Sequence, residues 1–152
     1  MKPFSFFLRL FFFIVMAGLY SFKPGDKDTL LVNDVFKETN EFRKSNGLKL
    51  LSMTDELNAI AQKHSENMAS GKTSFGHDGF DKRNVLAMKT LPDMKAFAEN
   101  VALDAKSAQA VLDLWKNSSG HRRNLLGNYQ YIGIGVARDK QGRIFYTQVF
   151  AG

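Results

Sequence analysis

Three polar side chains set among apolar residues are the groups in this sequence best suited to chemistry: His77, Glu99 and His121. Neutral imidazoles bind zinc and similar divalent ions, and a carboxylate completes or orients such a site. The same side chains also form a metal-free polar cluster if the carboxylate fixes the imidazoles by hydrogen bonds. The residue types alone are compatible with a metal site and with a metal-free polar cluster. Because the three lie far apart in sequence, only the fold can bring them together.

Two serines before His121 raise a second chemistry, nucleophilic catalysis. A nucleophilic serine needs a base, an orienting acid and an oxyanion hole. The sequence contains neither G-x-S-x-G nor H-E-x-x-H, the patterns of common serine and zinc hydrolases. We therefore expect Ser118 and Ser119 to cap a turn. Glu99 and Ser118 are the candidate catalytic residues if the protein is an enzyme.

The elements that would position these groups change in type along the chain. Apolar residues at helical spacing predict helices over 29–46, 54–70, 80–88 and 108–117, with a helical turn at 121–126. In the fourth helix Val111, Leu114 and Trp115 are expected to face the core. His64, on the apolar stripe of the second helix, is expected to pack inside. Residues 89–98 show no clear pattern.

The end of the chain has the period of a strand. Residues 132–136 alternate in size, residues 139–142 are typical of a turn, and 143–150 form a second apolar run, which predicts a β-hairpin. Gly133 and Gly135 would allow a helix or a loop to approach one face closely. Helices followed by strands favour an α+β domain.

The first 21 residues are typical of a secretory signal. Lys2 and Arg9 accompany an apolar run. The uninterrupted apolar part is shorter than the roughly 20 residues that a spanning helix needs. An uncleaved amino-terminal anchor is the alternative. The chain then divides into a signal peptide (1–21), a linker (22–28) and one domain (29–152).

Composition narrows the function classes further. The chain has no cysteine, which excludes thiol catalysis, disulfides and thiolate metal sites, and favours a bacterial over a eukaryotic exported protein. Its net charge of +6 is scattered, and no run of basic residues is longer than a pair such as Arg122-Arg123. Without a basic stripe we expect no nucleic-acid partner. We expect a monomer with no transmembrane span after signal removal.

Five segments, in order, resemble one known family. They are Phe42-Arg-Lys-Ser-Asn-Gly47, Leu57-Asn-Ala-Ile-Ala-Gln-Lys-His64, Ala98-Glu-Asn-Val-Ala102, Trp115-Lys-Asn-Ser-Ser-Gly-His-Arg-Arg-Asn-Leu-Leu126, and Ile132-Gly-Ile-Gly-Val136 with Tyr146-Thr-Gln148. Together they resemble the CAP superfamily, also called the SCP domain, of cysteine-rich secretory, antigen 5 and pathogenesis-related proteins. The likeness is to bacterial members, and it covers residues 31–152.

The resemblance implies an α-β-α sandwich with a central antiparallel sheet flanked by helices. It also implies a cleft with two histidines and two acidic residues, matched here by His77, Glu99 and His121. The second acidic position matches Ser118, so the tetrad is incomplete. Some relatives bind zinc or calcium there, so His77 and His121, with Glu99, are the implied metal ligands.

These observations favour an exported, non-enzymatic binding module of the cell envelope. Its ligand would be a small molecule, a lipid or a cell-wall component, with zinc or calcium as an optional partner. A hydrolase acting on peptides or wall material through the same cleft is the alternative. A third interpretation is an interaction protein whose cleft is vestigial.

Overall fold

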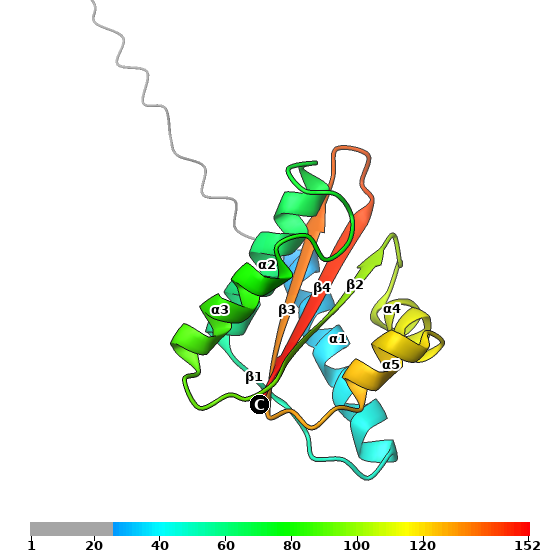
Figure 1. Ribbon diagram of the computed structural model, residues 1–152. Coiled ribbons are helices and arrows are strands. Elements are labelled where there is room, and N and C mark those ends of the chain that lie inside the picture. Colours follow the sequence, from blue (N-terminus) through cyan, green and yellow to red (C-terminus); the bar gives the residue numbers. More distant parts are fainter. Residues whose placement is uncertain (1–25) are drawn as a thin grey trace, which may run out of the picture.

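The computed structural model describes residues 26–152, so the predicted signal peptide lies outside the described residues. Figure 1 shows helices on both sides of a central sheet. The elements in chain order are α1 (Asp26–Ser45), β1 (Ser52–Met53), α2 (Asp55–Ala69), α3 (Phe80–Thr90), β2 (Phe97–Leu103), α4 (Ala108–Lys116), α5 (Ser119–Leu125), β3 (Tyr131–Arg138) and β4 (Ile144–Ala151).

The sheet has four strands in the order β1-β3-β4-β2. The predicted hairpin is confirmed as β3 and β4, and β2 lies antiparallel to β4 at the sheet edge. The two-residue β1 pairs with β3 in parallel. The α+β sandwich expected from the sequence is therefore confirmed, with one short parallel strand added to the antiparallel sheet.

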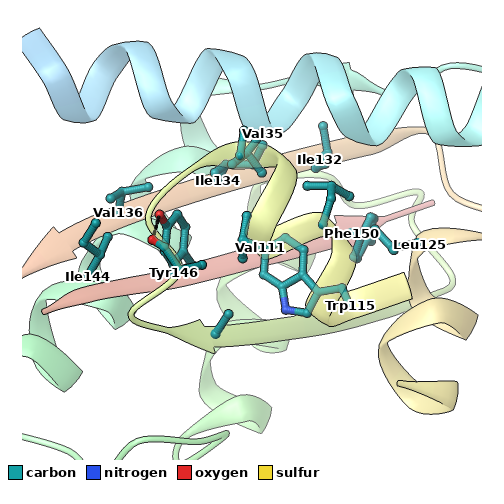
Figure 2. Packing of buried hydrophobic residues seen from close by; sticks show 14 of the residues in the cluster. Val35, Val111, Trp115, Leu125, Ile132, Ile134, Val136, Ile144, Tyr146 and Phe150 are labelled. Carbon is teal, nitrogen blue, oxygen red and sulfur yellow. Dashed lines mark hydrogen bonds between the residues drawn. The ribbon is translucent and has the colours of Figure 1, made fainter. Parts of the chain in front are cut away.

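The larger core fills the layer between the sheet and α1, α4 and α5. Figure 2 shows Trp115 of α4 beside Val111 and Phe150 in this layer. The Trp115 side chain is 1% exposed, and its indole Nε1 donates to the Val101 carbonyl over 3.1 Å. That bond fixes α4 to β2, the strand that carries Glu99.

Two glycines let α2 lie against the opposite face of the sheet. A Cβ atom at Gly133 would sit 2.2 Å from the Leu57 backbone, and one at Gly135 would sit 2.2 Å from Gln62 N. Both distances are far below a van der Waals contact, so only glycine fits. The close approach expected from the sequence is confirmed, and it sets the depth of every α2 side chain, including His64.

Several expectations about local structure are wrong or incomplete. Leu114 does not face the core, because it is 53% exposed while Leu112 is fully buried. The inward face of α4 follows the 108, 111, 112, 115 spacing instead. Residues 97–103, which include part of the unassigned segment, form β2. The first helix begins at Asp26, three residues before the expected start.

Between residues 26 and 152, no helix combines the length and apolarity needed to cross a membrane.

Candidate functional site

Glu99 lies at the centre of the site because β2 is an edge strand between the two helical layers. Its register partner on β4 is Val149, which belongs to the apolar cluster under α2 and α3. Its neighbour Asn100 pairs with Gln148 and faces the opposite layer, since successive strand residues alternate sides. The adjacent residues Glu99 and Asn100 therefore face the two different helical layers at this edge of the sheet.

The Glu99 carboxylate is bound by Arg83 of α3. The Arg83 Nε donates to Oε2 over 2.6 Å and Nη2 donates to Oε1 over 2.7 Å, a two-pronged ion pair. The Glu99 side chain is fully buried and that of Arg83 is 10% exposed. A third donor, Nη1, binds the Asp78 carbonyl over 2.8 Å. Arg83 thus neutralises Glu99 and also anchors the loop before α3.

His77 contacts the same carboxylate from that loop. Its Nδ1 lies 2.8 Å from Glu99 Oε1, while its side chain remains 49% exposed. Because the carboxylate can only accept hydrogen bonds, this contact requires a proton on Nδ1 of His77. In the neutral ring, Nε2 is then an acceptor that no group among residues 26–152 occupies, and the Glu99 contact fixes the orientation of the ring.

His64 is the third group near Glu99. As expected it is buried on α2, at 2% exposure, yet its Nε2 also lies 3.9 Å from Glu99 Oε1 and 2.8 Å from the Gly76 carbonyl. Its Nδ1 is buried without a hydrogen-bond partner among residues 26–152. Burial lowers the pKa of His64 and the charge of Arg83 lowers it further, whereas Gly76 and Glu99 act in the opposite direction. A neutral His64 thus supports the loop that carries His77.

His121 reaches this edge from α5, in the other helical layer. Its carbonyl accepts a hydrogen bond from Asn100 Nδ2 over 3.3 Å, and Asn124 Nδ2 donates to the Glu99 carbonyl over 3.1 Å. Burial lowers the pKa of the half-buried His121, and repulsion from His77, when that ring is protonated, lowers it further. Within the described chain, no hydrogen bond or ion pair joins the His121 ring to Glu99.

Ser118 shows no arrangement for nucleophilic catalysis. It occupies the N-cap position of α5, but its side chain makes no capping bond. No hydrogen bond connects its hydroxyl to a histidine in the part of the chain that the structure describes. The expected turn is present, and Ser118 directly precedes α5, but its side chain does not cap the helix.

The chemistry of these groups limits how a metal would be held. Both Glu99 oxygens already accept bonds from Arg83 and His77, so the carboxylate fits the role of orienting residue better than that of ligand. Residues 26–152 contain no group of three or more His, Cys, Asp or Glu side chains placed to hold a metal. The remaining donors for zinc or calcium are the imidazoles of His77 and His121, two of the four that a closed zinc site uses.

Two residues near Glu99 were not predicted from the sequence to lie there: Arg83 and His64. The signal for Arg83 was present, because a buried carboxylate needs a cationic partner and Arg83 lies on a predicted helix. Which basic residue would reach Glu99 depended on the orientation of α3, which no sequence period fixes.

Comparison with known proteins identifies the family and the fold. The cysteine-rich secretory protein family, CAP, matches residues 36–150. The chain belongs to the CAP family. The Bacillus subtilis protein YkwD is 33% identical to it over 125 residues, 78% of this chain and 46% of YkwD. The B. subtilis membrane protein YlbC is 30% identical over 122 residues, 74% of this chain and 32% of YlbC. The CAP chain thus spans less than half the length of these relatives.

Solved structures carry the same fold. An extracellular SCP-domain protein from Bacillus anthracis superposes with a TM-score of 0.70 at 28% identity, over 82% of the CAP chain and 41% of its own. A cysteine-rich secretory protein from Staphylococcus aureus superposes with a TM-score of 0.67 at 27% identity, over 84% of the CAP chain and 40% of its own. An outer surface protein from Borrelia burgdorferi superposes with a TM-score of 0.66 at 19% identity, over 83% of the CAP chain and 92% of its own. At this identity the likeness supports the fold alone.

Proposed function

We propose that this CAP domain is an exported binding module that receives its ligand on the imidazoles of His77 and His121. One observation carries the proposal: the Glu99 carboxylate is bound within the protein by Arg83 and His77, while the His77 side chain stays half exposed. The charged pair therefore serves to hold an imidazole in place. A fixed, partly exposed acceptor is what a binding site requires.

The charge of the site favours an uncharged polar ligand. Arg83 and Glu99 cancel each other, and burial keeps His121 neutral at pH 7. Neutral imidazoles accept hydrogen bonds from hydroxyl and amide groups, which a glycan or peptide of the cell wall presents. Of the small-molecule, lipid and wall ligands expected from the sequence, the wall component agrees best with this neutral, polar site.

Export rests on two supports. The apolar leader after Lys2 has the pattern of a signal, and two similar solved proteins are named as an extracellular and a secretory protein. The proposed compartment is the cell envelope or the medium. Cell fractionation of the full-length chain, with detection of the leader by mass, tests it directly.

The hydrolase alternative has no specific observation in its favour. Both oxygens of the buried Glu99 carboxylate already accept hydrogen bonds, and no hydrogen bond joins Ser118 to a base among the described residues. A divalent ion held by His77 and His121 would act as a bridge to the ligand in this account. Zinc titration of His77→Ala and His121→Ala variants tests that bridge, since unchanged heats in both would exclude it.

The binding proposal is tested by calorimetry with soluble muropeptides. The full-length chain is expected to bind them, and His77→Gln is expected to weaken binding by about five-fold or more, since a lost hydrogen bond costs about 1 kcal/mol. Asp78→Asn is the matched control, because Asp78 is an exposed neighbour on the same loop. Equal affinities for the two variants would contradict the proposal.

A further inference from the structure

A cavity of about 640 Å³ lies between the end of α1, the segment before β1 and the α5–β3 connection. Its volume falls within the roughly 300–1,000 Å³ usual for small-molecule sites. None of its lining residues belongs to the Glu99 site. Its charged lining residues are Arg43 and Lys49, and its lining holds no acidic side chain. The cavity is therefore electrostatically positive.

Arg43 is a buried cation that forms no ion pair with any carboxylate among residues 26–152. Only 2% exposed, it uses Nε to bind the Lys49 carbonyl over 3.0 Å and Nη1 to bind the carbonyls of Leu125 and Gly127 over 2.8 and 2.9 Å. Nη2 has no hydrogen-bond partner among residues 26–152 and is not sealed from solvent. Burial lowers the pKa of Arg43, as expected for a charge that no carboxylate compensates. Arg83, the other buried arginine among the described residues, forms an ion pair with Glu99.

Tyr129 lines the same cavity as Arg43, and its ring is held in place by its neighbours. Its ring stacks on Phe150 at 5.3 Å between centroids, and a Cβ atom on Gly127 would lie 2.2 Å from Tyr129 Cε2. Gly127 thus allows the ring to lie against the backbone. Burial raises the pKa of Tyr129, and the charge of Arg43 lowers it, which places the phenol and the guanidinium in one electrostatic environment. Both groups line the same cavity.

We propose that this cavity binds a small organic carboxylate. The carboxylate would accept hydrogen bonds from Arg43 Nη2 and the Tyr129 hydroxyl, and Lys49 at the cavity wall would add attraction. Leu50 and Leu126 supply apolar surface for the body of the ligand. Two donor groups that line one cavity match the two oxygens of a carboxylate, whereas a phosphate presents more oxygens than these donors can satisfy. This inference is independent of the proposed binding at His77.

The test uses hexanoate as the probe and calorimetric titration of the full-length chain. Hexanoate is expected to bind, hexanol to bind at least about five-fold more weakly, and hexylamine not to bind. Equal binding of hexanoate and hexanol would overturn the proposal, because the charge would then have no role. Tighter binding of hexyl phosphate or inorganic phosphate would also overturn it, as an anion site of a different class.

Variants locate the binding without disturbing the carbonyl contacts of Arg43. Lys49→Gln is expected to weaken hexanoate binding about two- to five-fold, the range of a solvent-exposed charge pair. Tyr129→Phe, which keeps the stack on Phe150, is expected to weaken it about two- to ten-fold by removing one hydrogen bond. Lys44→Gln, the same charge change at an exposed α1 position, and His77→Gln are expected to leave it unchanged. If Lys49→Gln and Tyr129→Phe both behave like Lys44→Gln, the site assignment is wrong.

Discussion

Replacing Arg83 by methionine tests the internal pairing on which the site depends. Methionine keeps most of the aliphatic volume but removes both charge-assisted bonds to Glu99, at 2.6 and 2.7 Å. The carboxylate stays fully buried, with His77 as its remaining close partner. Breaking a buried ion pair by removing one member costs about 3–5 kcal/mol, since the other charge is left uncompensated. We expect a loss of that size in the free energy of unfolding.

Urea denaturation of the full-length chain measures this loss. Lys82→Met is the matched control, because Lys82 is an exposed neighbour on α3 that loses the same charge, and we expect a change within about 0.5 kcal/mol. The double variant Arg83→Met with Glu99→Gln is expected to be more stable than Arg83→Met alone, since no buried charge remains. A loss below about 1 kcal/mol in Arg83→Met, or a double variant that is less stable still, would refute the pairing argument.

Two further predictions concern packing and pH. Gly133→Ala is expected to lower the free energy of unfolding by at least about 2 kcal/mol, because the added Cβ would lie 2.2 Å from the α2 backbone. Gly120→Ala is the control, because a Cβ at that position meets open space. Equal thermal midpoints for the two variants would argue against the close packing. Burial lowers the pKa values of His64 and His121 below the ordinary 6.5, so the unfolded chain binds more protons and stability should fall as pH drops below about 6.5. Urea titrations at neutral and mildly acidic pH measure this dependence, which His64→Gln should reduce; an unchanged dependence would exclude His64 as a source.

Much of the fold followed from sequence because its signals were local. Thr54 and Ser107 are helix caps whose side chains accept from residues three positions later, as their types predict. The β3–β4 hairpin showed itself by alternation and turn residues. In contrast, β2 was missed because its residues are buried on both faces and do not alternate in polarity.

The candidate site was only partly accessible to the same reasoning. His77 and Glu99 were expected to meet, and they do, at 2.8 Å. Arg83 was not anticipated, because its partner is 16 residues away in sequence and the pairing depends on how α3 docks. His64 was correctly expected to be buried, but its place near Glu99 depends on the depth that Gly133 and Gly135 give to α2.

The central claim is that the Arg83–Glu99 pair holds His77 with Nδ1 protonated and Nε2 free for a ligand. A long-range ¹H–¹⁵N NMR spectrum of the imidazoles, recorded with and without soluble muropeptides, tests it most directly. The account predicts the Nδ1-protonated tautomer for His77 and a ligand-induced shift at its Nε2. An Nε2-protonated His77, or an Nε2 signal that muropeptides leave unmoved, would contradict it.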